Sequence, residues 1–371
     1  MEANVKLGRI LGIPVGLHVS WFLVFGLVTW SLAVGYFPAE YPALPRSAYW
    51  LLGAVTSLLF FGSVLVHELS HSVVALRNRI PVQGITLFIF GGVAQIAREP
   101  QDAGMEFRVA IAGPLASFGM AGLFAGLWWL DRAIPYLAAP SIWLMRINLI
   151  LGLFNLIPGF PLDGGRVLRA VIWHFTGNFY RATQVAAFTG QLVAFGFIGI
   201  GLLTMLTGNW VNGLWLAFIG WFLQNAAAAS YAQTSIQKAL RGVTVDQVMA
   251  RECPLVPATL SLRDLVDGYI LTGRRRCFFV TEEDHLRGIL TLADVTRVPQ
   301  EDWGRTFLTQ VVVPWERTIR VAPNMPLLDA LRIMDDAGVN QIPVVLGDEL
   351  VGMLSREQVL RYIRTRAELG L

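Results

Sequence analysis

Long apolar runs dominate the first two thirds of the chain. Six of them, each close to the ~20 residues that a membrane-spanning helix needs, cover residues 16–36, 48–76, 107–130, 141–158, 183–206 and 210–230. We do not expect the first run to be a cleaved signal peptide, because no cleavage site of small residues follows it and further spans do. The pattern therefore predicts a transmembrane domain of six helices over residues 1–235.

After residue 241 the apolar runs become short and alternate with amphipathic helical patterns, as in soluble α+β domains. This part also repeats itself with a period of about 64 residues, because SLRDLVDGYI is matched by PLLDALRIMDD, and GILTLAD by GMLSREQ. We expect a tandem pair of βαββα-like repeats over residues 243–303 and 304–371.

The segment between the second and third apolar runs has a different pattern. PVQGITLFIFGGVAQIA is rich in β-branched and aromatic residues and contains the pair Gly91-Gly92, which predicts a hairpin or ribbon over residues 84–96. At membrane depth such backbone must be covered by protein or line a cavity. The alternative is a surface hairpin without a function of its own.

Composition and charge support this division. The chain has 371 residues, of which 54% are hydrophobic and 15% charged, whereas soluble proteins carry about 25% charged residues. Only 21 of the 55 charged residues lie in residues 1–240, and 34 lie in residues 241–371. A single ordinary soluble enzyme is therefore excluded, and a net charge of +3 is too small to indicate a nucleic-acid partner.

The basic residues also predict an orientation. Those that flank the apolar runs fall mostly on one side, for example Lys6, Arg77 and Lys238, while Arg46 and Arg132 fall on the other. By the positive-inside rule, we expect a multi-pass protein of the cell membrane, embedded in the lipid bilayer, with both termini in the cytoplasm.

The second apolar run contains His67-Glu68-Leu69-Ser70-His71. Positions i and i+4 share one face of a helix, so both imidazoles can reach one Zn²⁺, and Glu68 stands beside the first of them as a base for water. Charged groups inside a spanning helix cost about 2.5–3.5 kcal/mol each, which favours a functional interpretation. The alternative, two histidines that only hydrogen-bond to neighbouring helices, does not account for Glu68.

Zinc in a catalytic site needs a third protein ligand. We expect this ligand to be Asp163, in the segment FNLIPGFPLDGGRVL after the fourth apolar run. Its prolines and glycines interrupt the helix, and the irregular backbone can present a carboxylate to a cavity. The alternative is an aspartate that only caps the helix after it.

The motifs HELSH, NLIP and LDGG together resemble the site-2 protease family of intramembrane zinc metalloproteases. The stretches GIPVGLHVSW, FGGVAQ and AGPLAS are similar to further parts of that family. The resemblance implies one Zn²⁺ per chain on His67, His71 and Asp163, with Glu68 as general base and Asn155 holding the substrate or the oxyanion. It also implies a single-pass membrane protein as the substrate, for example an anti-sigma-factor-like regulator.

The repeat after residue 241 resembles a tandem pair of CBS domains through Gly288-Ile289-Leu290-Thr291-Leu292-Ala293-Asp294. This resemblance implies an adenine nucleotide such as ATP or AMP at Thr291 and Asp294, and a homodimer through the CBS domains. The second copy carries Gln358 in place of the aspartate, so we expect at most one good nucleotide site. The alternative is a structural or dimerising pair without a ligand.

Taken together, we expect a membrane protein with a six-helix transmembrane metalloprotease core followed by a soluble α+β tandem CBS module. The predicted activity is that of an intramembrane zinc endopeptidase, modulated by nucleotide at the CBS pair. The alternative is a CBS-regulated transporter or channel in which His67, Glu68, His71 and Asp163 line a cation path. A permeation path, however, gives no reason for a glutamate beside a histidine pair at this spacing.

Overall fold

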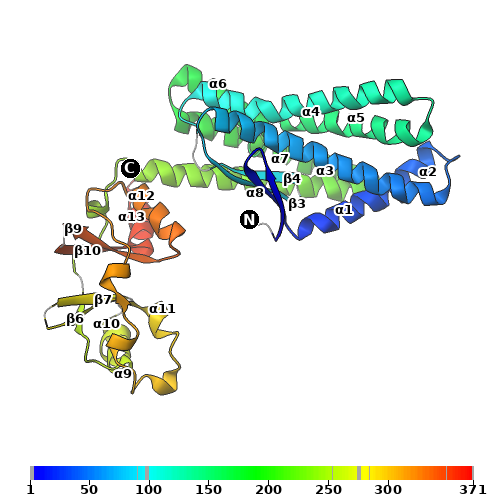
Figure 1. Cartoon of the computed structure of the whole chain (residues 1–371). Helices are drawn as coiled ribbons and strands as arrows, with labels where there is room; N and C mark the ends of the chain where they lie inside the picture. The colour runs from blue at the N-terminus through cyan, green and yellow to red at the C-terminus, as the bar shows by residue number, and fades with distance from the viewer. Residues whose placement is uncertain are drawn as a thin grey trace. The chain divides into compact units, whose positions relative to one another are not determined.

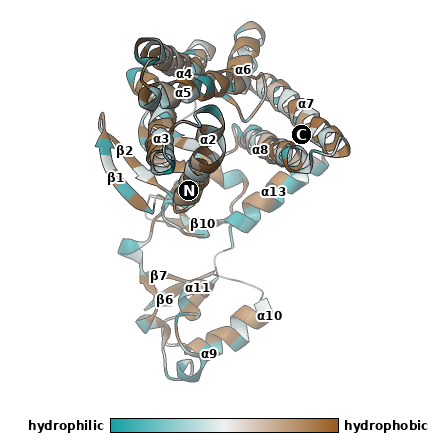
Figure 2. Ribbon diagram, turned by 90° about the vertical axis from the view of Figure 1, so that its right-hand side faces the viewer, coloured by the Kyte–Doolittle hydropathy of each residue, from teal (hydrophilic) through white to brown (hydrophobic). Residues whose placement is uncertain are grey.

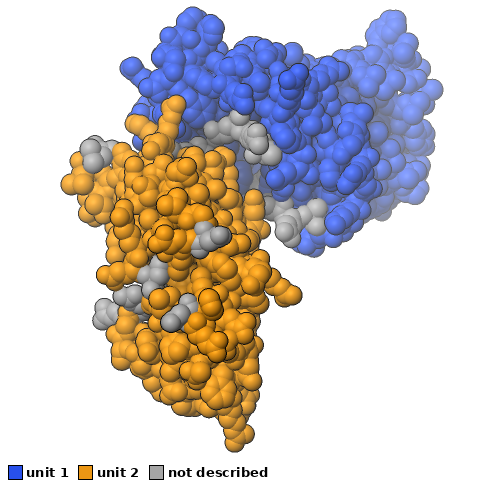
Figure 3. Space-filling view, turned by 60° about the vertical axis from the view of Figure 1, so that its left-hand side comes forward, with its two compact units in different colours: residues 1–234 blue, residues 235–371 orange. Residues whose placement is uncertain are grey.

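The computed structural model describes residues 4–89, 91–96, 100–252, 254–273, 277–283, 285–347 and 349–369. The chain divides into two compact units, residues 1–234 and 235–371, shown in separate colours in Figure 3. Each unit is described by itself.

The first unit is a helical bundle with one small sheet (Figure 1). Helix α4 packs against α3, α5 and α6, so it lies at the centre of the contacts that build the unit. The helices are α1 (Ser20–Ser31), which continues through a π-helical turn (Leu32–Tyr36) into α2 (Phe37–Glu40), then α3 (Arg46–Arg77), α4 (Ala103–Asp131), α5 (Pro135–Asn155), α6 (Asp163–Thr176), α7 (Phe179–Leu206) and α8 (Trp210–Leu240).

Five of the described helical stretches are long and apolar enough to cross a membrane: Ser20–Glu40, Arg46–Arg77, Ala103–Asp131, Pro135–Asn155 and Phe179–Leu206. They coincide with five of the six predicted spans, and hydrophobic residues colour most of their length in Figure 2. The sixth predicted span, 210–230, does form a helix as part of α8, which is not among the five stretches found in the described residues. The membrane core of the fold prediction is confirmed, with this difference in its last helix.

The sheet contains four strands in the order β1-β2-β3-β4, namely β1 (Val5–Ile10), β2 (Ile13–Leu17), β3 (Val82–Phe88) and β4 (Gly91–Ile96). Strands β2 and β3 are parallel, and the other two pairs are antiparallel. The predicted hairpin over 84–96 is thus confirmed as β3 and β4. The first hairpin is a correction, because residues 16 and 17 were expected in the first span, which begins only at Ser20.

The second unit contains two copies of one α+β motif, as the repeat predicted. The first copy is β5 (Leu255–Pro257), α9 (Leu262–Leu265), β6 (Cys277–Glu282), β7 (His285–Thr291) and α11 (Leu292–Val295), and β8 (Val313–Pro314) completes its sheet in the order β5-β6-β7-β8. In the second copy, Val321 bridges to β9, and the elements are α12 (Leu327–Asp336), β9 (Gln341–Leu346), β10 (Glu349–Ser355) and α13 (Arg356–Glu368).

Short helical turns connect these elements: Val245–Gln247, Val266–Ile270, α10 (Leu271–Gly273), Gln300–Asp302, Leu308–Gln310 and Trp315–Arg317. Each copy surrounds its own apolar core, one around Leu262, Phe278 and Leu290 and the other around Leu327, Ile342 and Leu354.

Helices α7 and α8 approach each other through glycines. A Cβ atom added to Gly201 would lie 2.6 Å from the Ala217 backbone nitrogen, and one added to Gly220 would lie 2.6 Å from the Ala194 carbonyl oxygen. Small residues at such crossings allow the close packing on which helix association in lipid depends.

We predict that Gly201→Val lowers the thermal stability of the protein in detergent, because the new side chain must force α7 and α8 apart. Overpacking of this kind costs roughly 1–3 kcal/mol. Gly199→Val is the matched control, since a Cβ atom at Gly199 meets no atom within 4 Å. Equal melting temperatures for the two variants would show that the crossing tolerates a side chain.

Candidate metal centre

Two histidines of α3 and one aspartate of α6 converge on a single point inside the first unit. The Nε2 atoms of His67 and His71 lie 3.3 Å apart, and each lies 3.1 Å from Oδ2 of Asp163. Both histidines are 4% exposed. Helical spacing places the two imidazoles on one face of α3, and the first residue of α6 meets them there.

The other nitrogen of each imidazole has a partner on α4. His71 donates from Nδ1 to the carbonyl oxygen of Val109 at 2.7 Å, and Nδ1 of His67 lies 2.9 Å from the hydroxyl of Ser117. A carbonyl oxygen only accepts hydrogen bonds, so it fixes the His71 tautomer that leaves the Nε2 lone pair facing Asp163. This is the outer hydrogen bonding that orients histidine ligands of metals.

The charge of Asp163 suits this arrangement. Burial acts to raise the pKa of the Asp163 carboxyl, but the two imidazoles facing it hold that pKa well below its usual range. At 3.1 Å each Nε2 donates to the carboxylate when it carries a proton, and a metal ion would take the place of such a proton among the three atoms. The three residues form a group that could hold a metal ion.

The spacing of these atoms fits zinc. Zinc bound to nitrogen and oxygen at about 2.0–2.1 Å in a tetrahedron has ligand atoms about 3.3 Å apart. The three separations of 3.1, 3.1 and 3.3 Å match that edge length. Two imidazoles and one carboxylate leave a fourth position open, as catalytic zinc sites do.

Space at the centre depends on Gly113 of α4. A Cβ atom there would lie 2.2 Å from Nε2 of His71 and 2.6 Å from Nε2 of His67. Gly113 lies four residues before Ser117, so both are on one face of α4. This face supplies the Ser117 hydroxyl to His67 and, at Gly113, the space that the two Nε2 atoms need.

Asp163 is held by a tightly folded loop. Cβ atoms added to Gly164 and Gly165 would lie 2.3 Å from backbone atoms of residues 156 and 159, respectively. Helix α7 supports the loop from outside, since Phe160 donates its N–H to the Ala186 carbonyl and a Cβ at Gly190 would meet the Phe160 oxygen at 2.1 Å. The loop glycines therefore serve the placement of the carboxylate.

Glu68 lies against the sheet. A Cβ atom at Gly92 of β4 would lie 2.4 Å from Cγ of Glu68, so the glycine makes room for this side chain. Strand β4 packs on α3 and stands at one edge of the four-stranded sheet. Glu68 is thus next to His67 in sequence and next to an edge strand in space.

The structure does not bring Asn155 into the cluster. It ends α5, directly before the loop of Asp163, and its amide nitrogen donates to the Leu151 carbonyl at 3.0 Å. An amide nitrogen carries two N–H groups, so one remains to be offered to another acceptor.

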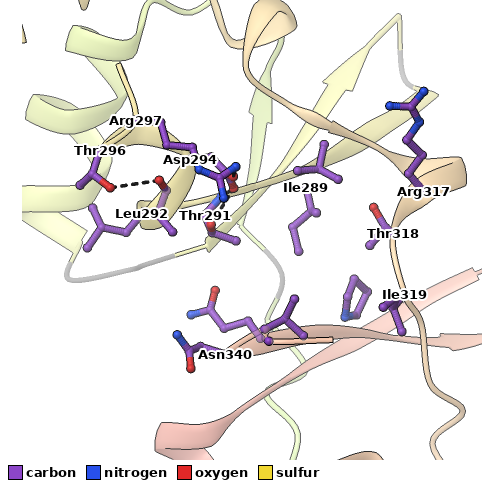
Figure 4. Close-up of a pocket in the computed structure, with 16 residues that line it drawn as sticks. Ile289, Thr291, Leu292, Asp294, Thr296, Arg297, Arg317, Thr318, Ile319 and Asn340 are labelled. Carbon is purple, nitrogen blue, oxygen red and sulfur yellow. Dashed lines mark hydrogen bonds and ion pairs between the residues drawn. The ribbon is translucent and has the colours of Figure 1, made fainter. Parts of the chain in front are cut away.

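The second unit contains a cavity of about 570 Å³ (Figure 4). Thr291 and Asp294 line it, together with the guanidinium-bearing Arg297 and Arg317 and the apolar Ile319. Oδ2 of Asp294 accepts hydrogen bonds from the Thr291 N–H at 3.0 Å and the Thr291 hydroxyl at 2.6 Å. The structure thus places both predicted nucleotide-binding residues at one cavity.

Several residues of the metal centre were not singled out from the sequence. Ser117 and Gly113 stand four apart in AGPLAS, a spacing that places both on one helix face, and this signal was available. Gly92 belongs to the glycine pair of the hairpin. The Val109 carbonyl leaves no trace in the sequence, because any residue type supplies a carbonyl oxygen.

Comparison with known proteins gives two family matches. The family model described as "Peptidase family M50" matches residues 55–131 and 132–198, and these two ranges contain His67, His71 and Asp163. The family model described as "CBS domain" matches residues 245–301 and 311–365.

Relatives match over nearly the whole chain. A protein of Synechocystis sp. named "Putative zinc metalloprotease sll0528" is 36% identical over 374 residues, which cover 99% of this chain and 97% of the relative. "Zinc metalloprotease MJ0392" of Methanocaldococcus jannaschii is 29% identical, with 97% and 96% covered. The solved structure "Site-2 Protease from Methanocaldococcus jannaschii" is 32% identical and aligns to 61% of this chain and 94% of its own, with a TM-score of 0.43.

We predict that Gly113→Ala lowers zinc affinity by roughly tenfold or more, the loss typical when the surroundings of a ligand are disturbed. All three ligand residues are retained, but the new methyl group must displace the imidazoles from the positions they take in the structure. The measurement is zinc content of the purified protein after dialysis against a weak chelator. Gly122→Ala, on the same helix with no atom within 4 Å of the added Cβ, is the control. Full zinc in Gly113→Ala would contradict the site.

Proposed function

Because the chain belongs to peptidase family M50 and is a zinc metalloprotease with a C-terminal pair of CBS domains, we propose that it cleaves transmembrane segments of other membrane proteins. The observation that carries this proposal is the convergence of His67, His71 and Asp163, in which both histidines and Glu68 belong to α3, a helix apolar enough to cross a membrane. This is regulated intramembrane proteolysis by a site-2 type enzyme.

The alternative of a CBS-regulated transporter or channel is disfavoured. Relatives that match nearly the whole chain are named zinc metalloproteases. A catalytic centre also accounts for Glu68, which a cation path leaves without a reason.

The proposed chemistry divides between the metal ligands and Glu68. His67, His71 and Asp163 would hold zinc, which when bound would supply a Lewis acid for the scissile carbonyl and for water. Glu68 accepts a proton from the attacking water and delivers it to the leaving amine. Asn155 contributes its second amide N–H to the substrate or the oxyanion.

The substrate is proposed to bind as an extended strand. A transmembrane helix hides its peptide bonds in hydrogen bonds between residues i and i−4, so it must unwind locally before cleavage. The freed backbone needs new partners in the apolar membrane. Strand β4 offers an edge directly beside Glu68, where a strand can be added to the sheet.

The proposal also covers the orientation of the protein in the membrane, its substrates and its assembly. Both termini lie in the cytoplasm by the positive-inside rule. The substrates are single-pass proteins, for example regulators of the anti-sigma-factor kind, and the CBS domains can join two chains into a homodimer.

We predict that Glu68→Gln retains one zinc per chain and loses proteolysis by a factor of 100 or more, the range of general acid–base catalysis being roughly 10²–10⁴. Quantitative proteomics of membranes from cells that express either form identifies the substrates as proteins that accumulate with the variant. Mapped cleavage ends are expected within apolar segments. Identical membrane proteomes, with zinc bound in both proteins, would refute the proposed activity.

We also propose that the cavity at Thr291 and Asp294 binds an adenine nucleotide such as AMP or ATP and that binding modulates proteolysis. The cavity combines a carboxylate for ribose hydroxyls, arginines for phosphates and an apolar wall. Asp294 is only 9% exposed, and Thr291 and Arg297 hold its two oxygens at the cavity wall.

For the nucleotide site we predict one molecule of AMP or ATP bound per chain, measured by calorimetry on the full-length protein. Asp294→Asn keeps an acceptor for the Thr291 N–H but removes the charge, and is expected to weaken binding about tenfold or more, since hydrogen bonds to charged groups contribute roughly 1.5–3 kcal/mol. Asp329→Asn, an exposed aspartate of α12, is the control. Absence of heat with ATP, ADP and AMP alike would withdraw the proposal.

A further inference from the structure

A buried ion pair joins α4 to α6 close to the metal centre. Oε1 of Glu106 accepts a hydrogen bond from Nε of Arg169 at 2.7 Å and a second from Nη2 of the same guanidinium. Glu106 is fully buried and Arg169 is 8% exposed. Arg166 adds a second positive charge, with its Nε 3.9 Å from the same oxygen.

The guanidinium of Arg169 is also enclosed by two aromatic rings. It lies 5.0 Å from the ring centroid of Phe160 and 4.7 Å from that of Phe179. Phe160 precedes Asp163 by three residues in the loop, and Arg169 follows it by six in α6. One side chain thus contacts the chain both before and after Asp163.

On α4, Glu106 lies on the face that serves the metal centre. Val109, Gly113 and Ser117 follow it at intervals of three, four and four residues, which keeps all four on one side of a helix. This face orients both imidazoles through Val109 and Ser117, and Glu106 extends it by one turn to α6.

We propose that the Glu106–Arg169 ion pair is a positioning device that fixes Asp163 over the two histidines. The inference rests on the proposed function, since it assigns Asp163 as the third ligand. The histidines come from α3 and are oriented by α4, whereas Asp163 comes from a helix that follows an irregular loop. A directional contact between α4 and α6 makes one helix the common reference for all three ligands.

The form of the pair supports positioning over stabilisation. Replacing a buried ion pair by apolar residues of similar volume often leaves stability unchanged or improved, so such pairs are weak devices for stability alone. Oε1 takes both hydrogen bonds while Oε2 of Glu106, also buried, has no hydrogen-bond partner among the described residues. The two donors of one rigid guanidinium that converge on Oε1 fix its direction, which a lysine or an apolar contact does not.

The test uses the full-length protein in detergent with Co²⁺ in place of zinc, because the visible spectrum of cobalt reports its ligands without any substrate. Asp163→Asn provides the reference spectrum for a weakened carboxylate ligand. Glu106→Gln and Arg169→Met are the test variants, and Arg108→Met is the control, since Arg108 is exposed on α4 and donates to Asn78.

We expect both test variants to shift the cobalt spectrum towards that of Asp163→Asn and to lose metal to a chelator at least about tenfold faster. The control should match the wild type. Wild-type spectra and release rates in Glu106→Gln and Arg169→Met, whatever their melting temperatures, would overturn the proposal.

The double variant Glu106→Gln/Arg169→Met separates positioning from folding. Glu106→Gln leaves the buried guanidinium of Arg169 without its carboxylate, and Arg169→Met leaves Glu106 with only the 3.9 Å contact to Arg166, so either single variant can fold poorly. The double variant removes both members of the pair, and the charge left at this place is that of Arg166, whose side chain is 23% exposed. We expect the double variant to regain thermal stability but not the wild-type cobalt spectrum. Recovery of both would mean that the pair acts through stability alone. A shifted spectrum in a protein whose wild-type form cleaves nothing would contradict the proposed activity and leave the positioning role standing.

Discussion

Three possible ligand atoms that face one point inside an apolar bundle are the constraint on which the first unit depends. Nε2 of His67, Nε2 of His71 and Oδ2 of Asp163 lie within 4.8 Å of one another, and the surroundings keep them from turning away. Helix α4 holds the outer nitrogen of each imidazole. Helix α7 closes the loop of Asp163 through backbone contacts that only glycines allow.

The same constraint explains where regular structure stops. Irregular backbone is tolerated at membrane depth only where protein covers it or a cavity receives it. The loop between α5 and α6 is covered by α7 and ends at the metal centre, and the β3–β4 hairpin packs on α3 beside Glu68. Both departures from helix therefore lie next to residues of the candidate centre, one at Asp163 and one at Glu68.

Much of this arrangement could be predicted from the sequence, because its strongest signals are local. Length and apolarity predict the spans, HELSH predicts two ligands on one helix face, and the repeat predicts two copies of a small α+β motif. The hairpin β1–β2 was missed because its short apolar segment merges with the first span. The Val109 carbonyl and the pairing of Glu106 with Arg169, which stand 63 residues apart, depend on how helices pack, and no local pattern encodes that.

The two CBS copies show what the fold alone requires at the start of the helix that follows β7 in one copy and β10 in the other. In the first copy Asp294 accepts the Thr291 N–H at 3.0 Å, and in the second the neutral Gln358 accepts the Ser355 N–H at 2.7 Å, so either side chain completes the same helix start. The cap requires an acceptor and not a charge. A nearly buried carboxylate is costlier to fold than an amide, and the structure answers its charge with Arg297, whose Nη1 lies 3.3 Å from Oδ1 of Asp294. The helix start and this ion pair together give both oxygens of Asp294 a partner at the wall of the cavity, whereas the neutral Gln358 completes its helix start without a charge.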